Sequence, residues 1–125
     1  MKKNDINTPL QDLRDAAKKF CDDRDWQQFH NPKDTAMNLA IESSELLEHF
    51  LWKTPEQLKR QFTNDAAYRQ EVLDELADVM HACLALANAL EGVDVTTAFF
   101  TKLEKTSQKY PIAKAKGRAN KYNKL

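Results

Sequence analysis

Two pairs of acidic residues with the same spacing are the side chains in this sequence best suited to chemistry. Glu42 and Glu45 form the first pair, and Glu75 and Asp78 form the second, about 30 residues further along the chain. Residues three apart on an α-helix lie on one face, so each pair would form a carboxylate patch. If the two helices packed antiparallel, the four carboxylates would converge. Converging negative charges repel unless cations lie between them, so the pattern predicts a metal site.

The ligand chemistry of this site indicates the metal. Carboxylate oxygens without cysteine and without an obligatory histidine favour Mg²⁺, with Mn²⁺ as a possible substitute. Mg²⁺ held by protein carboxylates usually completes its shell with substrate phosphates, so the pattern suggests phosphate chemistry. From spacing alone, the alternative stays open that these acids form surface salt bridges with Lys and Arg.

A di-iron centre in a helical bundle is a rival metal hypothesis. Such a centre requires Glu-x-x-His motifs on two helices. Asp78 and His81 have this spacing, but His49 lies four residues after Glu45, and no second motif occurs. The sequence therefore favours magnesium over iron.

Helices are the elements expected to position the acids. Two glycines and four prolines among 125 residues leave few of the breaks that a many-stranded protein needs. We expect an all-α bundle of four to five helices in a single domain, residues 1–125. Apolar periodicity places these helices at about residues 9–23, 32–52, 55–64, 65–91 and 95–109.

Capping residues mark the expected helix starts. Thr8 and Thr54 each begin a capping-box pattern, and Asn31 and Asp94 are expected N-caps. On the helix that follows Asn31, an apolar stripe lies beside a polar stripe made of Asn38, Glu42, Glu45 and His49.

The second half of the fourth predicted helix indicates an oligomer. Between Val79 and Leu90 only His81 and Asn88 interrupt the apolar residues. A helix that is apolar nearly all round must be covered on all sides by other elements. A small monomer has too few elements to cover it readily. We expect the bundle to be completed in a homodimer or homotetramer.

Cysteine usage and hydropathy bear on the compartment. Cys21 and Cys83 fall among apolar neighbours, and we expect both to be reduced packing residues. No apolar run reaches the length of a membrane span, and the N-terminus is polar. We expect a cytoplasmic protein without a membrane partner.

Charge is unevenly distributed although the net charge is zero. The middle of the chain is acidic, whereas residues 102–125 are basic with Glu104 as their only acid. An acidic middle argues against binding to duplex nucleic acid, which needs a continuous basic face. The basic tail, about residues 112–125, is expected to be solvated and flexible, although it could close over an anionic ligand.

Aromatic residues gather around the start and the end of the second predicted helix. Trp26, Phe29 and His30 precede it, and Trp52 lies at its end. Aromatic faces can stack on a nucleobase, but aromatic side chains between helices also pack simply as core. Both interpretations stay open from the residues alone.

Several segments, in this order and spacing, resemble the MazG-like all-α nucleoside triphosphate pyrophosphohydrolases, and within them the dCTP pyrophosphatase branch. The matching segments are 24–30 (Arg-Asp-Trp-x-Gln-Phe-His), 40–52, 74–79, 109–111 and 121–122. The resemblance implies an intertwined helical dimer, often paired into a tetramer. It also implies Mg²⁺-dependent cleavage of a deoxynucleoside triphosphate, foremost dCTP or a 5-substituted dCTP, to the monophosphate and pyrophosphate.

The resemblance also assigns roles to residues. Glu42, Glu45, Glu75 and Asp78 would bind metal and carry catalysis, with Glu45 as the candidate general base. The base and sugar pocket would be formed by Trp26, His30 and Trp52. The phosphate or lid residues would be Lys109, Tyr110, Lys121 and Tyr122.

Three positions depart from the pattern of the branch. Ala17, Ala82 and Thr106 stand where histidine, tyrosine and asparagine are common. Smaller side chains at 17 and 82 could widen the pocket, so a broad-specificity deoxynucleotide pyrophosphatase is an alternative. A non-catalytic helical interaction protein with the same fold is a second alternative.

Overall fold

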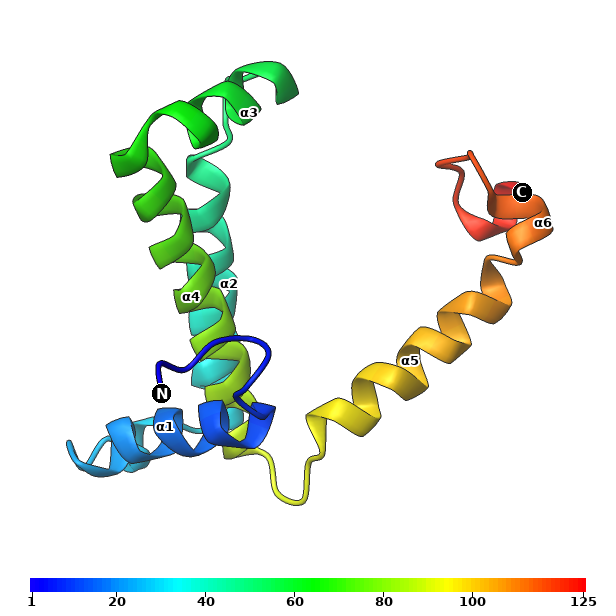
Figure 1. The fold of residues 1–125 in the computed structure, drawn as a ribbon. Coiled ribbons are helices and arrows are strands. Elements are labelled where there is room, and N and C mark those ends of the chain that lie inside the picture. Colours follow the sequence, from blue (N-terminus) through cyan, green and yellow to red (C-terminus); the bar gives the residue numbers. More distant parts are fainter. The chain divides into compact units, whose positions relative to one another are not determined.

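The computed structural model describes residues 1–125 as helices joined by loops, without strands, which confirms the predicted all-α fold (Figure 1). Contacts divide the chain into two compact units, Met1–Gly92 and Val93–Leu125. The first unit contains α1 (Leu10–Asp22), the 3₁₀ turn η1 (Gln27–Phe29), α2 (Pro32–Glu48), α3 (Pro55–Asn64) and α4 (Ala66–Ala89). The second contains α5 (Val95–Lys109), α6 (Ile112–Ala115) and η2 (Tyr122–Lys124).

Helix α4 is the centre of the first unit. It packs along α2, with which it runs antiparallel, and it also contacts α1 and α3 (Figure 1). The short α3 connects α2 to α4 and approaches the start of α4, where the Arg69 guanidinium lies 4.4 Å from the centre of the Phe62 ring. The antiparallel α2–α4 pair therefore brings together the two helices that carry the acidic pairs.

The predicted helix starts are confirmed at three of four positions. The side chains of Asn31 and Asp94 each accept a backbone N–H of the first turn, and Thr54 forms its capping box with Gln57. The prediction at Thr8 was wrong. Pro9 is the N-cap in extended conformation, which leaves Thr8 one position outside the helix, where its hydroxyl donates to the side chain of Asn7 instead.

Helix α2 ends earlier than the sequence predicts. Its last residue is Glu48, and the following N–H groups of His49 and Phe50 bond three residues back, as in a tightening final turn. Trp52, the predicted end, has a φ of +65°, a left-handed conformation that cannot continue an α-helix. The aromatic residue that was expected at the helix end therefore lies on a turn.

The rotation of α2 about its axis decides which side chains reach the interior. Glu42 and His49 of the polar stripe are half-buried, as are Leu39 and Leu46. Much of the apolar stripe is exposed, and Leu47 keeps 53% of its surface accessible. The helix thus turns acidic and basic groups toward α4 and leaves apolar side chains on the surface of the chain.

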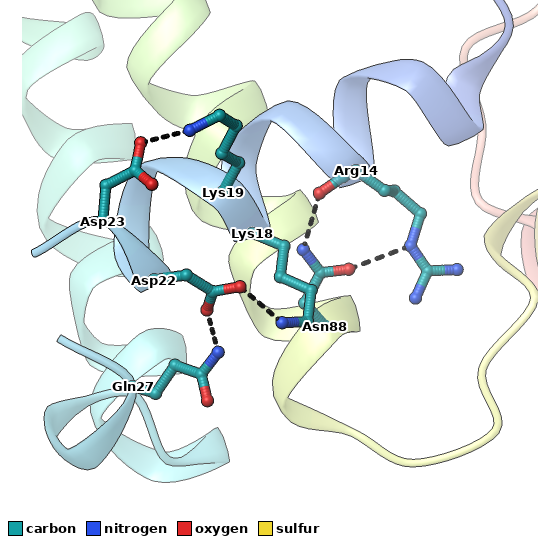
Figure 2. A network of polar contacts seen from close by, with 7 residues as sticks. All are labelled: Arg14, Lys18, Lys19, Asp22, Asp23, Gln27 and Asn88. Carbon is teal, nitrogen blue, oxygen red and sulfur yellow. Dashed lines mark hydrogen bonds and ion pairs between the residues drawn. The ribbon is translucent and has the colours of Figure 1, made fainter. Parts of the chain in front are cut away.

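Asn88 interrupts the apolar part of α4 because it docks α1. Its amide donates to the Arg14 carbonyl oxygen at 3.0 Å, and Arg14 Nε donates back to Asn88 Oδ1 at 3.1 Å (Figure 2). On the same side of α1, Asp22 accepts hydrogen bonds from Lys18 and Gln27 (Figure 2). The Arg14 contacts join α1 to α4, and the Asp22–Gln27 contact joins the end of α1 to the loop that carries Trp26, Phe29 and His30, which we call the aromatic loop.

The two cysteines have different environments. Cys21 is buried on α1, as expected, and burial is the main cause that raises the pKa of its thiol. Cys83 is exposed on α4, so its predicted packing role is wrong within this chain. The contacts of α4 bury its neighbours Ala82 and Leu84 but leave the side of Cys83 open. Neither cysteine forms a disulfide.

The second unit carries large apolar side chains on its surface. Phe99 and Phe100 of α5 are each 62% exposed, and their rings meet edge to face. Beyond α5, the basic segment forms one helical turn in α6 and a 3₁₀ turn in η2. No helix of the structure combines the length and the hydropathy needed to cross a membrane.

Candidate metal and nucleotide site

Three of the four predicted acids converge. Glu42 on α2 and Glu75 and Asp78 on α4 each offer a carboxylate oxygen, and these atoms lie within 4.8 Å of one another. We refer to these three residues as the carboxylate trio. Glu42 and Glu75 are half-buried and Asp78 is exposed, so the trio lies at the edge of the α2–α4 interface.

Glu45 lies beside the trio without being part of it. It is exposed one turn along α2 from Glu42, and the two carboxyl groups are within hydrogen-bonding reach of each other. Desolvation raises the pKa of Glu42 most, followed by the hydrogen bond and charge of Glu45 and then by the charges of Asp78 and Glu75. Glu42 therefore experiences the negative field of all three neighbouring acids.

The structure does not pair these acids with lysine or arginine, which was the salt-bridge alternative. The one basic partner is His49, whose Nε2 lies 3.8 Å from Glu75 Oε1. The second oxygen, Glu75 Oε2, is buried without any hydrogen-bond partner. A buried carboxylate oxygen left unsatisfied is costly, so this atom needs a ligand. The converging carboxylates of Glu42, Glu75 and Asp78 are hard oxygen donors, which fit a divalent cation such as Mg²⁺ or Mn²⁺.

An aromatic cleft of about 360 Å³ opens next to the trio. Trp26 and His30 both line it, and the His30 ring nitrogen Nδ1 hydrogen-bonds the Trp26 carbonyl oxygen at 2.8 Å. Trp26 is 43% exposed and meets the Phe20 ring edge to face. The cleft thus presents aromatic surface that a planar base can stack on.

Trp52 is not part of this cleft. The third predicted pocket aromatic is 98% exposed on the turn after α2 and contacts neither Trp26 nor His30. Its left-handed backbone directs the chain out of the helix instead of along it. Within one chain, the structure brings together only two of the three aromatic residues.

Asn38 and His81, which the sequence patterns did not assign to the nucleotide pocket, also line the cleft. Asn38 precedes Glu42 by one turn on α2, and His81 follows Asp78 by three residues on α4. Both side chains are exposed, and the His81 ring meets the Phe20 ring edge to face. The i, i+4 spacing of Asn38 and Glu42 was the signal that could have revealed the link. Four residues advance roughly 6 Å along an α-helix, so Asn38 links the cleft to the carboxylate trio by about one turn of α2.

The two small residues that depart from the branch pattern border open space. Ala82 is 2% exposed and lines the cleft. Ala17 lines a second cavity of about 180 Å³, which shares Cys21, His30 and Ala85 with the cleft. Thr106, by contrast, bonds its hydroxyl to the Lys102 carbonyl oxygen within α5.

The four predicted phosphate or lid residues meet within the second unit. The Tyr110 and Tyr122 rings are 6.0 Å apart in an edge-to-face arrangement. The amino groups of Lys109 and Lys121 lie 5.1 and 6.0 Å from the centre of the Tyr122 ring. The pair at 109–110 and the pair at 121–122, more than ten positions apart in sequence, therefore form one cationic and aromatic cluster.

The fold and the site define a class: an all-α protein that presents converging carboxylates beside an aromatic cleft. The chain belongs to the MazG-like family, whose model matches residues 38–125, as the sequence resemblance predicted. Its relatives include dCTP pyrophosphatase 1 of Rattus norvegicus, 35% identical over 93% of this chain and 67% of the relative. The protein of the same name from Homo sapiens is 34% identical over the same shares.

A solved structure supports this assignment. A pyrophosphatase from Archaeoglobus fulgidus superimposes with a TM-score of 0.74 at 32% sequence identity. The match covers 88% of this chain and 99% of that one.

Proposed function

We propose that this protein is a nucleoside triphosphate pyrophosphohydrolase that depends on Mg²⁺ and prefers dCTP or a 5-substituted dCTP. The observation that carries this proposal is the carboxylate trio, with the unpartnered Glu75 Oε2, one helical turn from the aromatic cleft. A nucleotide has the same layout, with a metal-binding phosphate chain at one end and a planar base at the other. The relatives named dCTP pyrophosphatase 1 support the reaction class.

The proposed reaction consumes one water and breaks the bond between the α- and β-phosphates. Its products are the nucleoside monophosphate and pyrophosphate. Bound Mg²⁺ supplies charge neutralisation for the phosphates and acidifies water. Glu42, Glu75 and Asp78 would hold the cation, and the exposed carboxylate of Glu45 would accept the proton that the attacking water loses. Trp26 and His30 would hold the base.

The cationic cluster of the second unit is proposed to bind the phosphates. Lys109 and Lys121 would add positive charge, and Tyr110 and Tyr122 would add hydroxyl donors. The positive charge of the basic tail would favour contact with a phosphate chain.

We also propose that the working unit is a homodimer or homotetramer. Large apolar residues remain exposed on several helices of the chain, including Ile41 at 53%, Leu76 at 51% and Phe100 at 62%. Covering this surface with a second copy would stabilise it, and a partner could bring the exposed Trp52 to the cleft. Light scattering coupled to size-exclusion chromatography should give a mass of at least twice the 14.4 kDa of one chain.

The free cysteines fit a reducing compartment, and we propose that the enzyme acts in the cytoplasm on nucleotide pools. There it would remove unwanted deoxynucleoside triphosphates.

The direct test incubates the purified protein with each of the four deoxynucleoside triphosphates, in Mg²⁺ or in EDTA. We expect monophosphate and pyrophosphate in equal amounts, in Mg²⁺ only and fastest with dCTP. Equal rates with all four would support the broad-specificity alternative. No turnover with any of them would contradict the proposal and favour the non-catalytic interaction protein.

A further inference from the structure

His49 is the one basic side chain that faces the carboxylate trio. Its Nε2 lies 3.8 Å from Glu75 Oε1, across the α2–α4 interface. Both side chains are shielded, with 21% of the His49 side chain and 27% of the Glu75 side chain accessible. The nucleotide chemistry described above assigns no task to this histidine.

The position of His49 is fixed from α4. His49 is the C-cap of α2, and its carbonyl oxygen accepts a hydrogen bond of 2.7 Å from the Tyr68 hydroxyl. Tyr68 is buried, and its ring meets the His49 ring edge to face with centres 6.0 Å apart. Tyr68 and Glu75 lie two helical turns apart on one face of α4, so this helix carries both the support of His49 and its target.

The two oxygens of Glu75 have different surroundings. Oε1 faces the His49 ring nitrogen, whereas Oε2 is buried without a partner. We propose that His49 is a positioning residue, whose Nε2–H holds Glu75 Oε1 so that Oε2 is directed at the metal. This inference rests on the proposed metal site. The 3.8 Å separation is roughly 0.8 Å longer than a hydrogen bond, so this role requires the two side chains to move closer together when a cation binds.

A histidine at position 49 suits a neighbour of a metal site better than a lysine or an arginine would. A lysine or arginine would bring a permanent positive charge beside a divalent cation, and the two would repel. A neutral imidazole donates one N–H without a net charge. Partners of this kind orient metal-binding carboxylates in many sites, and their removal weakens metal binding by about 10- to 100-fold.

Two amide variants test the role of the ring nitrogen. Glutamine places its side-chain N–H₂ near the position of Nε2, whereas the shorter asparagine reaches only as far as Nδ1. We expect His49→Asn to weaken Mn²⁺ binding by about tenfold or more and His49→Gln to restore most of it. The measurement is calorimetric titration of the full-length protein with Mn²⁺ alone at about pH 8, where an ordinary imidazole is neutral.

Tyr68→Phe is the matched structural control. It removes the 2.7 Å hydrogen bond to the His49 carbonyl but keeps the aromatic contact and the imidazole. We expect a lower melting temperature and a loss of Mn²⁺ affinity much smaller than that of His49→Asn, because the imidazole itself remains. In turnover, His49→Asn should raise the Mg²⁺ concentration needed for half-maximal activity and change kcat little at saturating Mg²⁺.

The outcomes separate the two proposals. Unchanged Mn²⁺ binding by folded His49→Asn would overturn the positioning role. Tighter binding would overturn it too, because His49 would then act as a positive charge that competes with the metal. Equal losses in the Asn, Gln and Phe variants would also overturn it, since destabilisation would explain them. A wild-type protein that binds no Mn²⁺ would instead overturn the metal site itself, and this inference with it.

Discussion

The two ends of the candidate site differ in how strongly the chain constrains them. At the metal end, three carboxylates from two packed helices converge, one oxygen is buried without a partner, and His49 is the only basic neighbour. At the base end, Trp26 is partly exposed, the exposed side chain of Asn38 lines the cleft, and the small side chain of Ala82 leaves space in the cleft. We infer that the packing of α2 against α4 determines the positions of the metal-binding carboxylates. Single substitutions in the cleft should change the base selectivity.

The largest effect is expected at the metal end. Glu75→Gln removes a charge and replaces an oxygen that no protein group satisfies. We expect kcat/KM to fall by about 1,000-fold or more, roughly 4 kcal/mol, for every nucleotide tested. Steady-state release of pyrophosphate measures this change.

Glu71→Gln is the control for this variant because Glu71 is an exposed acid one turn earlier on α4. It should keep wild-type activity. If the two variants lost activity equally, general electrostatics of α4 would explain the result and the special role of Glu75 would be lost.

The next effect is expected at the base end. Trp26→Ala removes the aromatic wall of the cleft while leaving the carboxylates in place. We expect KM for the preferred nucleotide to rise more than tenfold, at least ~1.4 kcal/mol, with turnover persisting at saturation. Trp26→Phe should recover part of the loss because it restores an aromatic face. An unchanged KM would make Trp26 a packing residue and remove the base end from the comparison.

A smaller effect is expected from refilling the cleft. Ala82→Tyr adds a ring at a buried position that lines it. We expect the larger purine nucleotides to lose several-fold more kcat/KM than dCTP, because an added side chain excludes the larger bases first. Competition among the four nucleotides in one mixture measures the ratio. A uniform loss across all four, with a lowered melting temperature, would indicate overpacking rather than selectivity.

The smallest effect concerns stability and pH. The pKa of Glu42 is raised in the folded protein above its ordinary value of 4.5, chiefly by desolvation. The folded state then binds more protons than the unfolded state, so this contribution to stability is present at low pH and is lost as pH rises through the folded pKa. Urea unfolding in EDTA should show a steeper loss of stability with rising pH for wild type than for Glu42→Gln. Identical slopes would contradict the raised pKa of Glu42 in the folded protein.

Local sequence patterns predicted much of the metal end. The i, i+3 spacing of the acids and the caps at Asn31 and Thr54 depend on backbone geometry within a few residues, and the structure confirms both caps. The convergence of Glu42 with Glu75 and Asp78 followed from antiparallel packing of two long helices. That Glu45 would remain outside the trio depends on the rotation of α2, which tertiary contacts set.

The base end was less predictable for the same reason. Helix α2 ends at Glu48, and Trp52 lies on a left-handed turn beyond it, which the helical apolar pattern does not reveal. Asn38 and His81 join the cleft through the packing of α1 and the aromatic loop against α2 and α4. A polar residue on a helix face gives no sign of a cleft until the elements around it are placed.

The most direct test is a crystal structure with Mn²⁺ and a dCTP analogue whose α,β-bridging oxygen is replaced by nitrogen, so that it resists cleavage. We expect anomalous density for Mn²⁺ bounded by Glu42, Glu75 and Asp78, with the cytosine ring against Trp26. Density for the metal away from these carboxylates, or a base bound outside the Trp26 cleft, would contradict the assignment of the two ends.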